Sequence, residues 1–261
     1  MERRSPGRPI GPQALGFLLI VLGGLFLVRN AGWFVLDWSV VWPILAIAFG
    51  AWIVLSALRH RGASAGASYV VPVAGEERLD LDLRVGAGRF RIAAVDDPAN
   101  LVSVVSTAGD IDAQRRRDGE RTRIRLVRDA SWWPIGWWDG GAEWRVGLPR
   151  AVSVRLDVAG GAGDFDIDLS AVPVADVRLA VGAAQIRLRL PRPAGDVPVR
   201  VATGASALAI DIPAGVEARI ATSGLLSVDG RTETPGYRDA SDRVTVTVEG
   251  GAASVRIADV A

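Results

Sequence analysis

The sequence predicts a two-helix transmembrane hairpin followed by an all-β domain, a β-solenoid or single-stranded β-helix with rungs of about 20–22 residues. Three observations predict this fold class. Two long apolar stretches lie near the N-terminus, and a short segment of Gly, Ala and Ser follows them. Beyond that segment, a unit of two alternating runs joined by a small-residue corner recurs along the chain.

The apolar stretches cover residues 13–28 and 40–58. The second is about 19 residues long, enough to cross a bilayer core of ~30 Å. Trp33 and Trp38 lie between the stretches, where interfacial aromatic anchors are expected. A helical hairpin in the membrane is therefore the favoured interpretation. The alternative, a cleaved signal peptide, is disfavoured because the first stretch runs into Arg29 without a small-residue cleavage site.

The distribution of arginine predicts the orientation of the hairpin. Arg3, Arg4 and Arg8 precede it, and Arg59 and Arg61 follow it. The positive-inside rule then predicts a multi-pass protein of the cell membrane with its N-terminus and its solenoid domain in the cytoplasm. The expected parts are a polar N-terminal tail at 1–12, the transmembrane hairpin at 13–60, a flexible linker at 61–68, and the β-solenoid at 69–261 with a Trp-rich insertion around 129–143.

The repeated unit accounts for the all-β part. Apolar and polar residues alternate strictly on both sides of each corner, which is typical of strands with one buried and one exposed face. A period of about twenty residues indicates copies that bury their apolar faces against one another. The corners are Gly86, Gly161, Gly182 and Gly204, and two less regular copies follow at 218–228 and 244–257.

Aligning the copies on these corners predicts the register. Asp166 is expected between Arg91 and Arg187, because opposite charges in neighbouring strands stabilise the pairing. An alternative for Asp164, Asp166 and Asp168 is a calcium site of carboxylates on one strand face; the charge ladder is the favoured interpretation. The expected inward columns are Leu83, Val158, Leu179 and Val201, and then Phe90, Phe165, Ile186 and Leu208. The insertion at 94–150 is expected to add strands.

Composition excludes several classes of chemistry. The net charge is +1, which gives no indication of a nucleic-acid partner, and the chain has no Cys and only His60. Thiolate nucleophiles, zinc-thiolate sites and sites built from several His are thus excluded. The glycine corners lack the helix and the Lys-Ser/Thr of a phosphate loop. We therefore expect no enzyme, no catalytic residue, no cofactor and no metal.

Two groups of residues are candidates for contacts with partners. A cluster of tryptophans around 134–136 is a candidate interaction surface, although capping or core packing is an equal alternative, and Trp144 is expected in the core. Arginines near a cytoplasmic anionic leaflet are candidate contacts of lipid headgroups, although a solvated loop is the favoured interpretation of 115–117. The candidates are Trp132, Trp133, Trp137 and Trp138 for interaction and Arg59, Arg61, Arg115, Arg116 and Arg117 for headgroups.

Residues 15–32 and 42–53 resemble the LiaF-like transmembrane region of bacterial cell-wall-active antibiotics response proteins. Residues 161–170, 174–179 and 188–191 are similar to the toast-rack β-solenoid domains often fused behind that region. The resemblance implies a non-enzymatic membrane protein linked to envelope stress, which in some members inhibits a membrane histidine kinase.

The resulting hypothesis is a membrane protein that presents a β-solenoid for protein–protein interaction in the response of the bacterial cell envelope to stress. The expected partners are the lipid bilayer and a membrane protein such as a sensor kinase, or a second copy of the chain. No nucleic acid and no small-molecule substrate are expected. The alternative is a structural scaffold that self-assembles through the solenoid ends, as bactofilin-like solenoids do.

Overall fold

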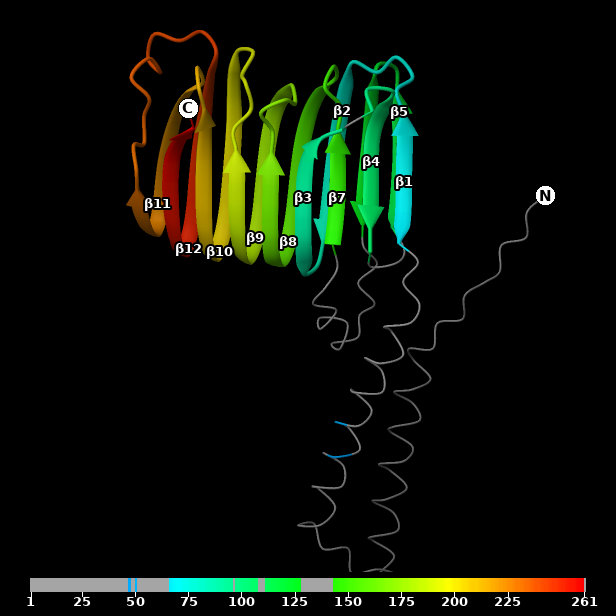
Figure 1. The fold of residues 1–261 in the computed structure, drawn as a ribbon, viewed down its shortest axis with the longest axis horizontal. Coiled ribbons are helices and arrows are strands. Elements are labelled where there is room, and N and C mark those ends of the chain that lie inside the picture. The colour runs from blue at the N-terminus through cyan, green and yellow to red at the C-terminus, as the bar shows by residue number, and fades with distance from the viewer. Residues whose placement is uncertain are drawn as a thin grey trace, which may run out of the picture. The chain divides into compact units, whose positions relative to one another are not determined.

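The computed structural model describes residues 66–95, 97–107, 111–127 and 143–260, and Ile47 and Gly50 before them. The four ranges form an all-β domain (Figure 1). Its strands are β1 (Ala67–Pro72), β2 (Arg78–Val85), β3 (Gly88–Ala94), β4 (Asn100–Ser106), β5 (Asp112–Asp118), β6 (Arg121–Val127), β7 (Glu143–Leu148), β8 (Ser153–Asp168), β9 (Val174–Arg189), β10 (Asp196–Pro213), β11 (Glu217–Asp229) and β12 (Arg243–Val260).

The predicted fold class is corrected in its helical part. The described residues are mostly strand, and they contain no helix of the length and apolar character needed to cross a membrane. The two expected helices at 13–28 and 40–58 lie outside the described residues, apart from Ile47 and Gly50. The structure is therefore classed as all-β, and the two-helix hairpin is withdrawn from the fold class. The predicted β-solenoid agrees with the observed domain.

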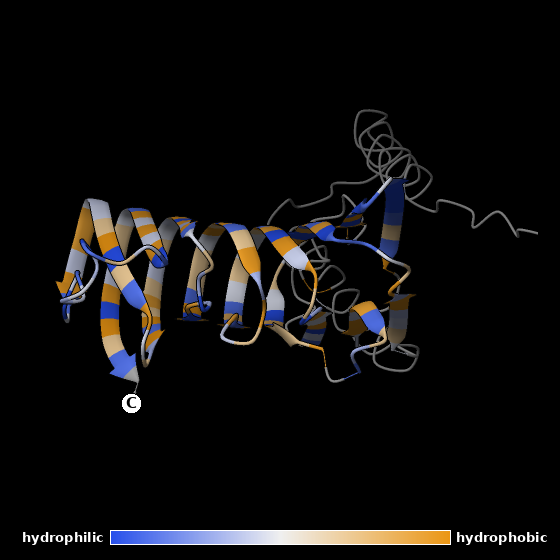
Figure 2. Ribbon diagram, turned by 90° about the horizontal axis from the view of Figure 1, so that it is seen from above, coloured by the Kyte–Doolittle hydropathy of each residue, from blue (hydrophilic) through white to orange (hydrophobic). Residues whose placement is uncertain are grey.

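Each long strand has two legs separated by a corner. The leg of β8 before its corner pairs with β2, and the leg after the corner pairs with β3. The parts of β8 to β12 before their corners form one sheet with β5, β6 and β2, and we call this sheet the first leg. The parts after the corners form another sheet with β1, β4, β7 and β3, and we call it the second leg. Polar and apolar residues alternate along both legs, so each leg buries one face (Figure 2).

Neighbouring rungs of the stack pair in parallel. Leu156 of β8 pairs with Val177 of β9, and Val177 pairs with Val199 of β10, which are steps of 21 and 22 residues. The predicted rung length is thus confirmed. The order at the C-terminal end departs from the chain order, because β12 lies between β10 and β11. β11 is consequently the last strand of the stack (Figure 1).

The glycine corners lie one above another, as their alignment predicts. The N–H of Gly161 donates to the carbonyl oxygen of Gly86 at 3.0 Å. A Cβ on Gly182 would lie 2.7 Å from the carbonyl oxygen of Gly161, and one on Gly204 would lie 2.8 Å from that of Gly182. Gly251 of β12 continues the column against Gly204. From Gly182 onward, the backbone of the preceding rung occupies the space that a side chain would need.

The two predicted inward columns are confirmed and form the core. Aromatic rings begin the second column, since Phe90 stacks on Phe165 with ring centroids 4.8 Å apart. The ring of Trp144 in β7 lies 6.3 Å from that of Phe90 and is buried, so its predicted core position is also confirmed. The columns follow the strand register through Leu83, Val158, Leu179 and Val201, and through Phe90, Phe165, Ile186 and Leu208.

The insertion at 94–150 supplies the predicted extra strands. β6 extends the first leg by pairing in parallel with β2, and β7 extends the second leg by pairing in parallel with β3. β6 and β7 therefore act as the two legs of a further rung. Residues 128–142, which separate these strands in the sequence, lie outside the described residues. The two strands that flank the tryptophans in the sequence, β6 and β7, belong to different legs and do not pair with each other.

Candidate functional site

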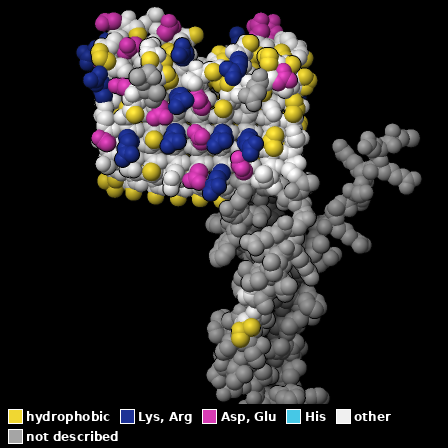
Figure 3. Space-filling model, viewed as in Figure 1, with side chains coloured by type: hydrophobic (Ala, Val, Ile, Leu, Met, Phe, Trp, Pro, Cys, Tyr) yellow, Lys and Arg dark blue, Asp and Glu magenta, His cyan; other side chains and the backbone are white. Residues whose placement is uncertain are grey.

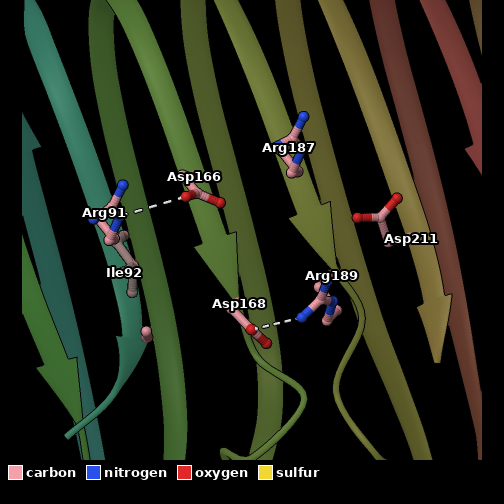
Figure 4. Close-up of a pocket in the computed structure, with 8 residues that line it drawn as sticks. Arg91, Ile92, Asp166, Asp168, Arg187, Arg189 and Asp211 are labelled. Atoms are coloured by element: carbon pink, nitrogen blue, oxygen red, sulfur yellow. Dashed lines mark hydrogen bonds and ion pairs between the residues drawn. The ribbon is translucent and has the colours of Figure 1, made fainter. Parts of the chain in front are cut away.

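Charged side chains alternate across the outer face of the second leg (Figures 3 and 4). Asp166 lies between Arg91 and Arg187 in the register of β3, β8 and β9, which confirms the predicted ladder. We call this surface the ladder face. It is defined by Arg91, Asp166, Asp168, Arg187, Arg189 and Asp211.

The aspartates of β8 each lie beside a guanidinium group. The distances are 3.6 Å from Arg89 to Asp164, 3.5 Å from Arg91 to Asp166 and 3.1 Å from Arg189 to Asp168. Among the residues that the structure describes, no three His, Cys, Asp or Glu side chains are grouped as metal ligands would be. The arrangement thus favours the ladder over the calcium alternative, because the carboxylates already have cationic neighbours.

Asp168 is the most strongly held of these carboxylates. Burial raises its pKa, but the hydroxyl and the backbone N–H of Ser170 donate to Oδ1 at 2.6 and 3.0 Å. The charge of Arg189 adds to these hydrogen bonds, and together they hold the pKa of Asp168 below its ordinary value. Asp168 is therefore ionised at neutral pH and anchors the end of β8.

Two shallow depressions lie on this face. One has a volume of about 280 Å³ at the ladder itself, and the other, of about 520 Å³, extends across β8 to β11. Small side chains form part of the floor of the second, since Ala209 pairs with Arg187 on one side and Arg256 on the other. Asp229 lies 3.9 Å from Arg256 at the far end. The face therefore offers long, open depressions with separated charges.

The first leg carries a second ladder with a more buried centre. Asp176 is 7% exposed and lies within 3.7 Å of Arg155, 3.4 Å of Arg178 and 3.0 Å of Arg200. These arginines come from β8, β9 and β10, so one carboxylate ties three rungs together. In the strand register, Asp80, Arg155 and Asp176 lie in one column. We assign this cluster to stability, since its carboxylate is covered.

A buried carboxylate that sequence reasoning missed lies in the turn before β2. The side chain of Glu76 is fully buried and accepts hydrogen bonds from the N–H of Ala74 at 2.6 Å and from Arg115 at 3.0 Å. Thr122 donates at 3.4 Å, and Arg117 lies 3.8 Å away. A lone Glu in a turn carries no periodic signal, so only the packing of β5 and β6 against this turn identifies it.

The cationic cluster at 115–117 is in a strand, so the expected loop is wrong. Arg115, Arg116 and Arg117 belong to β5, and the first and third of them pair with Glu76. Arg116 is exposed. A role in headgroup binding for these residues stays a prediction. The other predicted contacts, Trp132, Trp133, Trp137 and Trp138 as well as Arg59 and Arg61, lie outside the described residues.

Known proteins are similar to this chain in fold. A family described as the N-terminal domain of toast_rack, DUF2154, matches residues 61–211. A candidate cell adhesion protein from Clostridium sporogenes ATCC 15579 shares 15% identity with a TM-score of 0.67, over 75% of this chain and 99% of its own. A candidate adhesin from Bacteroides fragilis NCTC 9343 shares 10% identity with a TM-score of 0.25, over 75% and 98%. No curated protein matches significantly. The LiaF-like resemblance is not shown by these matches.

Proposed function

The chain belongs to the toast-rack family, and from this premise we propose that it is a non-enzymatic protein-binding module of the bacterial cell envelope. The ladder face is the proposed binding surface. The observation that carries this proposal is the combination of two open depressions with alternating, outward charges on one sheet face. A surface of this kind complements another protein over several strands.

The open shape of the ladder face suits a macromolecular partner better than a metabolite. Sites for small molecules are typically concave and mostly apolar, and they bury most of the ligand. The ladder face instead presents guanidinium groups and carboxylates in columns. Arg187 has carboxylates nearby but forms no ion pair within the described part of the chain, so its charge is available to a partner. Alternating charges of this kind set the orientation and the specificity of association.

The setting of this function is part of the proposal. We place the module at the cell membrane, with the β domain on its cytoplasmic side, and in the response of the envelope to stress. The resemblance of residues 15–32 to the LiaF-like region and the arginines on either side of residues 13–58 support this setting. A sensor kinase is the kind of partner that the resemblance implies. The fold shared with a candidate cell adhesion protein supports binding as the activity.

A photo-crosslinking residue in place of Ala209 of the full-length chain tests the proposal in living cells. We expect a discrete adduct with one partner protein, because Ala209 lies in the floor of the depression between Arg187 and Arg256. The control position is Ala180, which is exposed on the outer face of the first leg. Equal adducts from both positions, or none from Ala209, would contradict the assignment of the ladder face.

The charge of Arg187 provides the matched variant. Arg187→Glu reverses an exposed charge at the face, and we expect the yield of the adduct to fall by about tenfold, equivalent to about 1.4 kcal/mol. Arg192→Glu makes the same change at an exposed residue beyond the end of β9 and should leave the yield unchanged. The thermal stability of both variants is measured in parallel and should match that of the native chain.

A further inference from the structure

The two legs have four outer edges, and those at the N-terminal end of the stack are protected. On the first leg the edge strand is β5, whose Arg115, Arg116 and Arg117 place three like charges along it. On the second leg the edge strand is β1, which exposes Val70 but ends in Pro72, a residue without a backbone N–H. Charges and proline are usual means by which edge strands avoid pairing with another chain.

At the C-terminal end the first leg of β11 is covered by the chain itself. The N–H of Ile220 donates to the carbonyl oxygen of Thr232 at 2.7 Å, and the N–H of Thr234 donates to that of Ala218 at 3.0 Å. The side chains of Arg219 and Glu233 pair across this contact at 2.7 Å. Residues 232–234 therefore close the third edge.

The second leg of β11 is the remaining edge. Within the described residues, nothing pairs with the outer backbone of β11 from Leu225 to Asp229. The segment carries no charge before Asp229 and contains no proline. Leu225 is 80% exposed and Val228 is 37% exposed at this edge. An unprotected edge with exposed apolar side chains is a template for strand addition.

We propose that this edge pairs with the same edge of a second copy, antiparallel and across a twofold axis. The uncharged run makes the segment compatible with itself, and an antiparallel arrangement places the two copies of Asp229 at opposite ends of the pair. The protected edges at the other end disfavour a head-to-tail contact, which would propagate into a filament. The result is a closed dimer in which Leu225 is covered, instead of the end-to-end scaffold considered from the sequence.

The dimer would join two ladder faces into one surface. The second depression extends onto β11 through Ser227 and Asp229. Pairing of the two β11 edges would therefore continue this depression across the twofold axis. A bivalent partner would then bind more tightly without a new kind of contact. The inference does not depend on the proposed function, because edge pairing leaves Arg187 and Ala209 uncovered.

Crosslinking of single-cysteine variants tests the pairing. The chain has no native Cys, so Leu225→Cys gives the purified full-length protein one thiol. A short bismaleimide should link two chains through this position at micromolar concentration, because a twofold axis brings a residue near its own copy. Ser68→Cys in β1 is the control and should stay monomeric. No link through position 225, or a link between 225 and 68 in a mixture of the variants, would overturn the proposal.

Light scattering of edge variants gives an independent readout. The native chain of 27.6 kDa should have about twice that mass. Ser227→Lys and Leu225→Arg add a charge to the edge and should each raise the dissociation constant by at least about tenfold. Ala207→Lys adds the same charge on β10, away from the edge, and should leave the dimer intact. A native monomer, or a dimer that survives both edge variants, would refute the pairing.

Discussion

At the residue scale, hydrogen-bond donors and two guanidinium groups surround the buried carboxylate of Glu76. Burial raises the pKa of this carboxyl group, and the backbone N–H groups of Ala74 and Glu76 lower it. The charges of Arg117 and Arg115 lower it further, so the pKa of Glu76 lies below its ordinary value of 4.5. Because one buried carboxylate joins the turn before β2 to β5, its ionisation is coupled to the position of the edge strand.

The substitution Glu76→Gln should lower the free energy of unfolding by about 1–3 kcal/mol at pH 7, because it leaves two arginines without their buried partner. A depressed folded-state pKa contributes stability above the unfolded-state pKa and loses it as pH falls through the folded-state value. The native chain should therefore lose more stability than the variant on acidification from pH 6 to below pH 4. Urea denaturation across this range, with exposed Glu77→Gln as control, measures the difference. Parallel pH profiles would argue against the linkage.

The glycine column offers a steric test with an internal control. Gly182→Ala places a Cβ 2.7 Å from the carbonyl oxygen of Gly161, so the rungs must separate, at a cost of about 1–3 kcal/mol. Gly86→Ala introduces the same methyl group at the start of the column, where nothing lies within 4 Å. The second variant should be neutral or slightly stabilised. Thermal unfolding that ranks the two variants in the opposite order would contradict the stacked corner.

At the element scale, the charge ladder helps to fix how the strands align. A slip of one residue would expose Phe165 and bury Asp164 and Asp166, so the alternating pattern opposes it strongly. The ion pairs add less energy, because Arg91 and Asp166 are at least half exposed. They reinforce the register that the alternation sets, since Asp166 lies beside an arginine of β3 on one side and an arginine of β9 on the other.

Asp166→Arg should therefore destabilise the domain by about 1 kcal/mol, because the new guanidinium group lies between Arg91 and Arg187. Glu249→Arg makes the same change of charge at an exposed residue of β12 that has no ion pair in the described structure, and it should cost less than about 0.5 kcal/mol. Chemical denaturation of both variants at low and high salt gives the measurement. The difference in stability between the two variants should shrink at high salt. Equal destabilisation by both variants would show that the ladder does not help to fix the register.

At the scale of the whole molecule, the last strand of the chain holds the end of the stack together. β12 pairs with β10 on one side and β11 on the other, so among the described strands β11 pairs with the stack through β12. The strand that completes this end of the stack therefore comes last in the sequence. This arrangement makes the exposed edge of β11 dependent on a strand that is later in the sequence.

Removal of residues 243–261 should therefore release β11 as well as β12. Backbone amides at 217–229 should lose their protection from hydrogen exchange, while those of β8 and β9 keep most of theirs. A chain that ends at residue 213 serves as the comparison, and the two truncated proteins should show the same protection in β9 and β10. Retained protection at 217–229 would show that β11 can take the place of β12 and would refute the dependence.

The sequence by itself determined the solenoid, its rung length and the register from β2 to β10, because alternation, corner glycines and charge pairs are local signals that repeat. It did not determine the position of β12, the closure by 232–234 or the partners of Glu76, which depend on contacts between residues far apart in the chain. The helical hairpin was predicted from two apolar stretches and the tryptophans between them, and it is not part of the described fold. The free edge of β11 likewise became visible only in three dimensions, because an edge is defined by the strands that do not lie beside it.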